Sequence, residues 1–282
     1  MGGTPLQALA ASTRKRLHDA GITNADQEAR WLICDFFNLT TADLIAHAER
    51  PMDVPPAFEA AVRRRMDGEP LQYILGTAPF FGRDFLVSPG VLIPRADTET
   101  LIAAALSFFP EDAEFSFMDW GTGSGCIGLT LLLERPQARA LLADKSPEAL
   151  RCAEANAERH GLKARARLLP TEDPADIPPA EHDLLISNPP YIPTDALPHL
   201  MREVRHEPRL ALDGGADGMN LYRALLARAP SWLRPGGLVI LEAGDASQAA
   251  ALRDLPLPRL SFLRAFMDNS AIPRCVVWQY PG

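Results

Sequence analysis

The stretch Phe115–Glu134, "FSFMDWGTGSGCIGLTLLLE", is the clearest indicator of architecture in the chain. Residues 115–120 have the apolar character of a buried strand, and residues 126–134 predict a helix. Gly123, Gly125 and Gly128, which start between these two elements, have the spacing GxGxxG. Glycines at such a place let the backbone turn tightly and approach a ligand, and the helix N-terminus supplies N–H groups. The stretch therefore predicts a strand, a ligand-binding loop and a helix.

Strand and helix signals alternate through the rest of the chain. Residues 139–144 predict a strand, and the following segment predicts a helix that Ser146 caps and Gly161 ends. Such alternation is typical of an α/β fold. We expect residues 97–282 to form a doubly wound, mostly parallel, seven-stranded Rossmann-like sheet. The other strand candidates are residues 164–169, 182–187, 236–242, 260–267 and 274–280.

The first third of the chain is predicted to be helical. After Asn24, a candidate N-cap, apolar residues recur at helical spacing, and residues 56–66 repeat this pattern. We expect residues 1–75 to form a small all-α domain, for which the family resemblance described below implies a role in docking the substrate. Residues 76–96 are rich in aromatic and β-branched side chains with glycine and proline between them, which indicates a β-hairpin-like linker. Asp97 is the expected cap of the helix that follows.

Composition argues against several classes of protein. The formal net charge of −8 disfavours a broad electrostatic grip on nucleic-acid phosphates. The 4 cysteines form no CxxC pair and the 6 histidines no HExxH motif, so neither a disulfide framework nor a metal site is expected. No apolar run approaches the ~20 residues that span a bilayer. The N-terminus lacks the charge order of a secretory signal, and we expect a cytoplasmic protein.

Two carboxylates flank the glycine loop. Asp144, at the end of the second predicted strand, can accept hydrogen bonds from both ribose hydroxyls of a dinucleotide or of another adenosine cofactor. Asp119 stands just before the first glycine, where it would repel a pyrophosphate but suit a cationic, amino-bearing ligand. Three other interpretations remain at this point. The glycines can be ordinary turn residues, Asp119 can cap local N–H groups, and Asp144 can be a plain strand-end acid.

The segment Asn188–Tyr191, "NPPY", follows a predicted strand with an acceptor-rich turn. Such sheets bind ligands at the carboxyl ends of their strands, so Asn188 is expected beside the glycine loop. Pro189 and Pro190 have no N–H, and the Asn188 side chain and the Pro189 carbonyl can accept the two N–H bonds of a planar amide or amino group. The Tyr191 ring can pack on that group. The turn therefore predicts methyl transfer to a weakly nucleophilic nitrogen.

These motifs and their neighbours resemble the PrmC/HemK family, the glutamine-N5 methyltransferases that modify peptide chain release factors. The resemblance covers most of the chain. The segment "IPRADTE" with its linker is its most specific part, because "NPPY" alone is shared with DNA amino-methyltransferases. The matching segments are "GEPLQYILGTAPFFGRDFLVSPGVLIPRADTETLI" (68–102), "MDWGTGSGCIGLTL" (118–131), "LLADKSPEAL" (141–150), "ISNPPYI" (186–192), "EPRLALDGGADGMNLYR" (207–223) and "LRPGGLVILEAG" (233–244).

The resemblance implies a reaction and a set of site residues. A methyl group would pass from S-adenosylmethionine to the side-chain amide nitrogen of the glutamine in the GGQ loop of release factors. The implied substrate residues are Asn188, Pro189, Pro190 and Tyr191, with the catalytic role on Asn188, Pro189 and Tyr191. The implied cofactor residues are Gly121, Thr122, Gly123, Ser124, Gly125, Asp144 and Asn188, and our own candidates Asp119 and Asp173 complete the set.

The sequence departs from the family pattern near the expected adenine. The family has a Ser-Asp-aromatic step after its third strand, whereas this chain has Thr171, Glu172 and Asp173 without an aromatic residue. Which of the three meets the adenine stays open, and Asp173 is our candidate.

Two groups of charged residues each allow two interpretations. Arg95 and Glu99 suit an ion pair under the linker as well as they suit contact with the substrate. The run Arg63–Arg65 suits a solvated helix end better than a docking patch.

The main alternative functions are those of a nucleic-acid amino-methyltransferase and a ribosomal-protein glutamine methyltransferase. The first calls for a basic recognition domain, but residues 1–75 have eight Lys/Arg against ten Asp/Glu. The second family lacks the acids of "IPRADTE" in the corresponding segment. A non-catalytic cofactor-binding scaffold would have no need of Asn188, and a nicotinamide-dependent oxidoreductase would bind NAD in place of S-adenosylmethionine.

Overall fold

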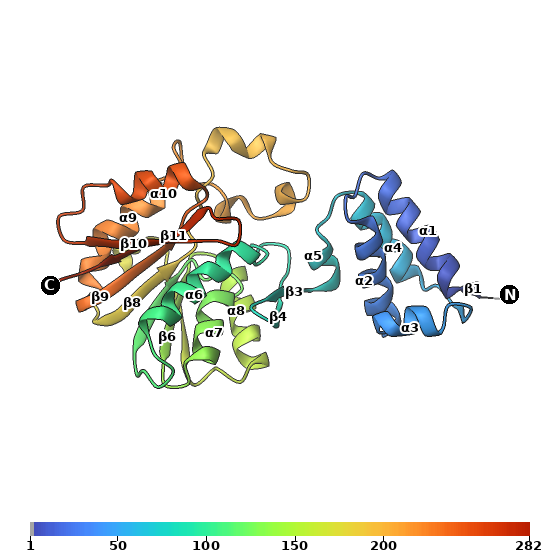
Figure 1. The fold of residues 1–282 in the computed structure, drawn as a ribbon, viewed down its shortest axis with the longest axis horizontal. Helices are drawn as coiled ribbons and strands as arrows, with labels where there is room; N and C mark the ends of the chain where they lie inside the picture. The colour runs from blue at the N-terminus through green and yellow to red at the C-terminus, as the bar shows by residue number, and fades with distance from the viewer. Residues whose placement is uncertain (1–2) are drawn as a thin grey trace. The chain divides into compact units, whose positions relative to one another are not determined.

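The computed structural model describes residues 3–282 (Figure 1). These residues form two compact units. The smaller unit contains the described residues up to Gly76 together with the segment Met201–His206. The larger unit contains Thr77–Leu200 and Glu207–Gly282. The chain of the larger unit is therefore interrupted by a short segment that packs with the smaller one.

Helices build most of the smaller unit. Their shared core is fully buried and includes Leu6, Leu17, Leu32, Ile33 and Phe58. Two strands of two residues each also pair in this unit, which the sequence did not indicate. The bounds are α1 (Leu6–Asp19), α2 (Ala25–Phe37), α3 (Thr41–Ala46), α4 (Pro56–Met66), α5 (Leu71–Leu75), β1 (Thr4–Pro5) and β2 (Pro51–Met52).

Arg65 is buried in the smaller unit and does not face solvent. Its side chain is 5% exposed and donates to the carboxylates of Glu28 and Glu203, with an Nη2–Oε1 distance of 3.1 Å to Glu203. The prediction of a solvated run Arg63–Arg65 is therefore wrong at its last residue, because two carboxylates replace water around that guanidinium. This ion pair also holds Met201–His206 in the smaller unit.

The larger unit begins with an antiparallel hairpin of β3 (Thr77–Phe80) and β4 (Arg83–Leu86). The fully buried Asn156 side chain accepts from the Leu86 N–H at 2.7 Å and donates to the Leu86 carbonyl at 2.9 Å. The same amide donates to the Ser124 carbonyl at 2.9 Å. One side chain thus ties the hairpin to the glycine loop.

The helix after the hairpin begins differently from the prediction. A 3-10 turn, η1 (Ala96–Thr98), precedes α6 (Glu99–Phe108). Asp97 lies inside this turn and makes no side-chain cap. Its carboxylate instead pairs with Arg274 at 3.2 Å. The prediction of Asp97 as a helix cap is wrong because the chain enters α6 through a 3-10 turn, which puts Thr98 at the cap position and the Asp97 carboxylate beside Arg274.

A seven-stranded sheet forms the centre of the larger unit, in the order β10-β11-β9-β8-β5-β6-β7. Strands β5 to β9 pair in parallel, and β11 is antiparallel to both of its neighbours. The expected mostly parallel sheet is confirmed. The bounds are β5 (Ser116–Trp120), β6 (Arg139–Asp144), β7 (Ala166–Pro170), β8 (His182–Ser187), β9 (Leu233–Glu242), β10 (Ser261–Met267) and β11 (Pro273–Gln279).

Helices cover both faces of this sheet, as a doubly wound fold requires (Figure 1). Helices α6, α7 and α8 share one apolar cluster with strand residues such as Phe117. Helices α9 and α10 share a second cluster with the alternate strand residues, such as Met118. The remaining bounds are α7 (Cys126–Glu134), α8 (Pro147–Arg159), α9 (Asn220–Arg228), α10 (Ala246–Arg253), and the 3-10 turns η2 (Pro174–Asp176), η3 (Thr194–His199), η4 (Val204–His206), η5 (Arg209–Ala211) and η6 (Ala229–Ser231).

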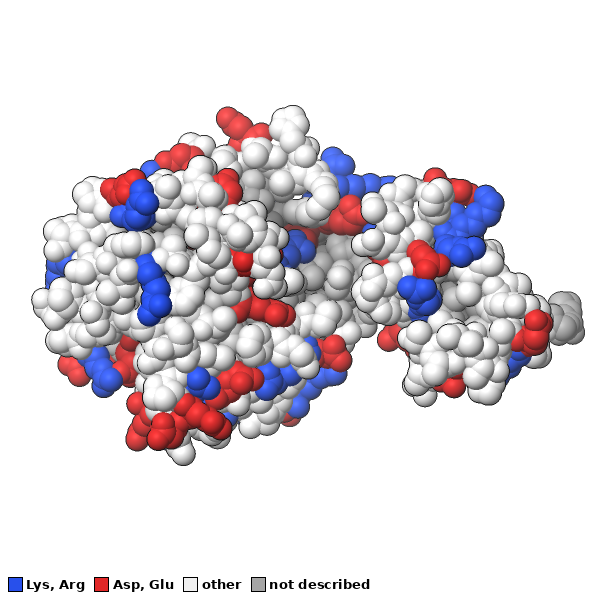
Figure 2. All heavy atoms as spheres, in the orientation of Figure 1, with Lys and Arg blue, Asp and Glu red and all other residues white. Residues whose placement is uncertain are grey.

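Charged side chains of both signs are mixed on one face of the described chain (Figure 2). On the face shown in Figure 2, Lys and Arg are interspersed with Asp and Glu, and the described residues of that face form no broad basic area. None of the helices within residues 3–282 is long and apolar enough to cross a membrane. The same residues contain no cluster of His, Cys, Asp or Glu that could hold a metal ion.

Candidate functional site

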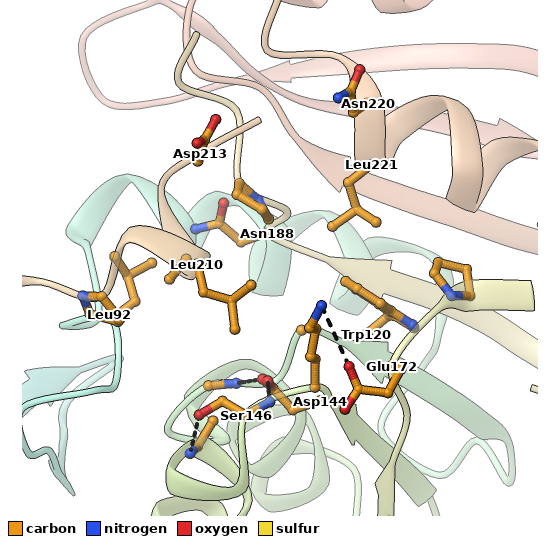
Figure 3. A pocket seen from close by; sticks show the side chains of 18 of the residues that line it. Leu92, Trp120, Asp144, Ser146, Glu172, Asn188, Leu210, Asp213, Asn220 and Leu221 are labelled. Carbon is orange, nitrogen blue, oxygen red and sulfur yellow. Dashed lines mark hydrogen bonds and ion pairs between the residues drawn. The ribbon is translucent and has the colours of Figure 1, made fainter. Parts of the chain in front are cut away.

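A cavity of about 560 Å³ opens at the carboxyl ends of the parallel strands (Figure 3). Strands β8, β5 and β6 are neighbours in that order. The residues at or just after their ends, namely Asn188, Trp120 and Asp144, all line the cavity. The crevice beyond these strand ends is where doubly wound sheets bind ligands. The cavity is therefore the candidate active site.

The glycine loop is held in place by strand β6. The N–H groups of Gly121 and Thr122 donate to the Ala143 carbonyl at 2.8 and 3.1 Å, and the Gly123 N–H donates to Asp144 Oδ2 at 2.8 Å. Gly123 has a φ of 57°, a left-handed conformation that costs other residues roughly 1–2 kcal/mol. Gly121 and Gly123 both line the cavity, so the loop presents bare backbone to a ligand.

Asp119 contacts the glycine loop on the side away from the cavity. It is not among the described residues that line the cavity. It is fully buried, and its Oδ2 accepts from the Thr122 hydroxyl at 2.7 Å and from the Gly128 N–H at 3.0 Å. These contacts are the capping role considered above as an alternative. Its Oδ1 is buried and finds no partner within residues 3–282. Contact between Asp119 and the amino group of a cofactor stays a prediction.

The close approach of Leu142 and Asp119 explains the glycine inside helix α7. A Cβ built on Gly128 would lie 2.4 Å from Leu142 Cδ2 and 3.0 Å from Asp119 Oδ2. Alanine normally stabilises a helix interior by roughly 0.5–1 kcal/mol relative to glycine. We expect Gly128→Ala to have the opposite effect and to lower the free energy of unfolding by about 1–3 kcal/mol through overpacking. Urea unfolding of the two proteins measures this, and a gain in stability would contradict it.

The surroundings of Asp119 disfavour ionisation of its carboxyl group. Burial raises its pKa from the ordinary value of 3.8 to about 7, and the bonds from Thr122 and Gly128 offset only part of that effect. The folded protein therefore binds this proton more tightly than the unfolded chain does. Stability contributed by the protonated group is lost as the pH rises from the ordinary pKa toward the folded one.

Asp119→Asn removes this titration while keeping one oxygen for the same donors. We expect the stability of the variant relative to the wild type to rise with pH between these two pKa values, by about 1 kcal/mol per pH unit. Thermal unfolding of both proteins without cofactor, at several values from about pH 5 to about pH 8, measures the difference. A difference that does not change with pH would show that Asp119 does not titrate in this window.

Asp144 lies at one wall of the cavity with both carboxylate oxygens fixed (Figure 3). Oδ2 accepts from the Gly123 N–H and Oδ1 from the Ser146 N–H, each at 2.8 Å. Burial raises the pKa of this carboxyl, and the backbone N–H groups of Ser146, Gly123 and Lys145 oppose the shift. Each oxygen keeps further lone pairs. The carboxylate can therefore accept from two adjacent hydroxyls, and ribose contact stays the prediction for it.

Trp120, Glu172 and Asp173 line the cavity wall where the adenine is expected. Glu172 pairs with Lys145 at 3.5 Å, and Asp173 caps the turn η2 with its side chain. Thr171 is buried beside them and is not among the described lining residues. The sequence reasoning looked for an aromatic residue after the third strand and missed Trp120, which stands at the end of the first strand of the sheet.

Asn188 lies across the cavity from Asp144 (Figure 3). Its Nδ2 donates to the Thr98 hydroxyl at 3.2 Å, and within residues 3–282 no donor reaches its Oδ1. Pro190 also lines the cavity, whereas Pro189 is buried next to it. The side-chain acceptor that the "NPPY" segment predicts is thus present at the cavity wall.

Tyr191 lies behind this wall. A Cβ on Gly244 would come within 2.7 Å of Tyr191 Cδ2, so the ring packs closely on that glycine. The ring also packs against the apolar cluster beneath α9 and α10. Burial raises the pKa of the Tyr191 phenol to about 12, which keeps it neutral. Stacking of this ring on a substrate group stays a prediction, and its contacts here stabilise the turn.

The segment "EPRLALDGGADGMNLYR" fixes the turn and supplies much of the cavity. The Ile192 N–H donates to the Leu212 carbonyl at 3.0 Å, and the Gly214 N–H donates to the Ile192 carbonyl at 2.8 Å. The resemblance singled out this segment, but we gave its residues no role. Those that line the cavity are Pro208, Leu210, Ala211, Asp213, Gly215, Asn220 and Leu221.

The cavity brings together part of the predicted site. Asp119 and the other buried members of the set shape the loop and the turn, so the motifs locate the site better than they identify the atoms that face a ligand. The predicted residues that line the cavity are Gly121, Gly123, Asp144, Asp173, Asn188 and Pro190. The predicted residues outside the described lining are Asp119, Thr122, Ser124, Gly125, Pro189 and Tyr191.

Arg95 and Glu99 have separate partners. Arg95 pairs with the buried carboxylate of Glu207, which also accepts from the Ile93 N–H at 3.2 Å. Glu99 accepts from the Phe81 N–H at 2.8 Å. The ion pair considered between Arg95 and Glu99 is therefore wrong. Sequence reasoning found no role for Glu207, which the structure makes the partner of the "IPRADTE" arginine.

The cavity fits an adenosine cofactor such as S-adenosylmethionine. Its volume of about 560 Å³ lies within the range of roughly 300–1,000 Å³ typical of ligand pockets. The glycine loop exposes backbone, Asp144 offers two oriented acceptors, and Trp120 and Leu221 add apolar surface. Asp119 Oδ1, buried beside the loop, has no partner within residues 3–282 and is a free acceptor for an amino-bearing ligand.

Comparison with known proteins extends these observations. Residues 8–76 match the PrmC N-terminal domain, and residues 95–207 match the methyltransferase small domain. A release factor glutamine methyltransferase of Moorella thermoacetica is 45% identical over 251 residues, 88% of each chain. Another, of Geobacter sulfurreducens, is 43% identical over 82% of this chain and 81% of that one. A solved methyltransferase of Pyrococcus furiosus shares the fold, with a TM-score of 0.52 at 18% identity over 71% of this chain and 90% of that one.

Proposed function

Because the chain belongs to the family of release factor glutamine methyltransferases, we propose that it methylates the glutamine of the GGQ loop in peptide chain release factors. The acceptor is the side-chain amide nitrogen, N5, and the donor is S-adenosylmethionine. The enzyme is a methyltransferase by its relatives and its matched domain. The proposed reaction takes place in the cytoplasm, where release factors act on ribosomes.

The glycine loop and Asp144 would hold the cofactor. Asp144 offers one fixed oxygen to each ribose hydroxyl, and Gly121 and Gly123 let the backbone lie against the ligand. Trp120 and Asp173 would border the adenine. The cofactor supplies a methyl group on a positively charged sulfur, which makes that carbon electrophilic.

Asn188 and Pro189 would hold the glutamine amide. Its nitrogen is a poor nucleophile because the lone pair is delocalised into the carbonyl group. Asn188 Oδ1 and the Pro189 carbonyl would each accept one N–H, fix the amide plane and stabilise the positive charge that grows on nitrogen. Alignment of this kind can supply up to ~7–11 kcal/mol of the barrier. The alkylated nitrogen is acidic, so its proton can pass to solvent without a strong base.

The orientation of the Asn188 amide is the observation that supports this best. Thr98 engages its Nδ2 at 3.2 Å, which leaves Oδ1 as the group available to a ligand. An unpaired acceptor at a cavity wall suits a substrate that brings N–H groups. Pro189, Pro190 and the backbone bonds of Ile192 keep the turn rigid.

Methyl transfer to a purified release factor tests the proposal. The full-length enzyme is incubated with methyl-labelled S-adenosylmethionine and the factor, and mass spectrometry locates the label on the GGQ peptide. The matched control is the same factor with that glutamine replaced by alanine. We expect label on the glutamine of the unaltered factor alone. Equal labelling of the altered factor, or label only on bare DNA or on a ribosomal protein, would overturn the proposal.

A further inference from the structure

A buried polar chain connects Asn188 to Glu242 through Thr98. Strands β8 and β9 are parallel neighbours with Ser187 paired to Leu241, so Asn188 and Glu242, one residue further along, lie side by side at the sheet edge. The Thr98 hydroxyl accepts from Asn188 Nδ2 at 3.2 Å, and Thr98 also lies within hydrogen-bonding reach of the Glu242 carboxyl, whose pKa it lowers. Thr98 is 2% exposed and Glu242 1%.

The direction of each hydrogen bond follows from the hydrogens available. An ionised carboxylate can only accept, and a hydroxyl has a single hydrogen. When Thr98 gives its hydrogen to Glu242, its oxygen can only accept on the side of Asn188. The NH2 of Asn188 must then point to Thr98, and the Asn188 carbonyl oxygen must point the other way.

The surroundings of Glu242 show why its charge state matters. Burial raises its pKa to about 7, while the Thr98 hydrogen bond and the Arg274 guanidinium act in the opposite direction. Arg274 is itself fixed by Asp268 at 3.1 Å. Glu242 Oε2 has no partner within residues 3–282, and burying a carboxyl in this way costs folding free energy. The other titratable groups near Glu242 are Arg95, Asp97, Cys126, Tyr191, Tyr222 and Cys275.

We propose that Thr98 and Glu242 are positioning residues for methyl transfer, which hold the Asn188 amide with its oxygen toward the substrate nitrogen. This inference rests on the proposed function, because the oxygen matters only for a substrate that brings N–H groups. Neither residue is among those described as lining the cavity, so both act through Asn188. Without Thr98 and Glu242 the Asn188 side-chain amide can flip. Its NH2 would then face the NH2 of the substrate, and two donors cannot hydrogen-bond each other.

Thr98→Val tests the chain with little change of side-chain shape. Valine neither accepts from Asn188 nor donates to Glu242. We expect the single-turnover rate of methyl transfer to fall about tenfold, with the dissociation constant of S-adenosylmethionine within about twofold of wild type. Thr98→Ser keeps the hydroxyl and should restore the rate. Glu242→Gln can donate to Thr98 and reverse the chain, so its rate should fall at least as far as that of Thr98→Val.

Glu242→Gln also removes a titration. The wild-type rate should rise with pH through about 7, because above this pKa Glu242 can only accept from Thr98. Below it the protonated carboxyl can donate to Thr98 and free the Asn188 amide. The Glu242→Gln rate should show no such limb, and an unchanged limb in that variant would overturn the role of Glu242.

Thr130→Val is the matched control. Thr130 is fully buried in α7, and its hydroxyl has no partner within residues 3–282. The same substitution there removes a buried hydroxyl that is not connected to Asn188 or Glu242. A rate loss in Thr98→Val with near-normal rates in Thr98→Ser and Thr130→Val supports the inference. Equal rates in Thr98→Val and wild type, or an equal loss in Thr130→Val, overturn it.

The outcome separates this inference from the function on which it rests. A wild-type enzyme that labels no release factor contradicts the proposed function, whatever the variants do. If the wild-type enzyme and Thr98→Val label the factor at equal rates, the result contradicts only the positioning role of Thr98 and Glu242. If Thr98→Val fails to fold, Glu242→Gln decides by the same comparison with wild type.

Discussion

Asn188→Ala is expected to lower the rate of methyl transfer by about 10²–10³, the loss typical of one preorganised polar contact to a transition state. The variant loses Oδ1, the side-chain acceptor at the cavity wall that no other residue of 3–282 occupies. The Pro189 carbonyl remains and accounts for the residual rate. Single-turnover measurements with saturating release factor and cofactor isolate the chemical step from binding.

Asn220→Ala is the control for this experiment. Asn220 has the same side chain and lines the same cavity, but it starts helix α9 and lies apart from Asn188 (Figure 3). Its substitution should leave the rate within about threefold of wild type, because it contacts no reacting atom in the proposed mechanism. An unchanged rate in Asn188→Ala, or an equal loss in both variants, would show that the Asn188 oxygen does not serve the reaction.

Asp144→Asn is expected to raise the dissociation constant of S-adenosylmethionine by about 10–10², because hydrogen bonds to charged groups are worth roughly 1.5–3 kcal/mol. The carboxylate accepts from the N–H groups of Gly123 and Ser146 at 2.8 Å with different oxygens. An amide cannot accept with its NH2, so one of these donors loses its partner. The variant thus weakens both the predicted ribose contact and the shape of the loop. Calorimetric titration measures the change.

Asp176→Asn provides the matched comparison. Asp176 is an exposed acid in the turn η2 and is not among the described lining residues of the cavity. It removes the same charge from the same unit, and we expect its dissociation constant within about twofold of wild type. Equal affinity in Asp144→Asn and wild type would remove Asp144 from the cofactor site. An equal change in both variants would mean that only net charge is being measured.

The sheet was predictable because each of its strands has a local signature. Buried parallel strands are near-continuous apolar runs, and the glycine loop, Ser146 and Gly161 mark the helix boundaries between them. Ser146 caps α8 by accepting from the Ala149 N–H, as expected. Asn24 occupies the cap position of α2, but its side chain makes no capping bond there. Such local rules identify elements more reliably than they identify individual hydrogen bonds.

Features that depend on distant partners were not predictable. Arg65 reads as part of a charged run, and only the fold brings Glu28 and Glu203 to it. Asp97 reads as a helix cap, and only the fold places Arg274 beside it. In each case a charged partner from elsewhere in the chain overrides a local preference. No periodicity or propensity records such a meeting.

The same distinction holds for the candidate site. "NPPY" and the glycine loop identify where ligands bind, because their backbone chemistry is local. Trp120 and Leu210 line the cavity only because the fold brings the strand end and the later segment together. Thr98 contacts Asn188 for the same reason, and Glu242 lies beside Asn188 only because β8 and β9 pair. The sequence reasoning gave neither Thr98 nor Glu242 a role.

The segment Met201–His206 links the two parts of the gene, because it is encoded within the sequence of the larger unit but packs with the helical unit. A gene fragment that starts at Thr77 would encode Glu203 without Arg65, its buried counter-ion. A fragment that ends at Gly76 would encode Arg65 without Glu203. Recombination that exchanged one of these halves between relatives would have to preserve an ion pair across the break.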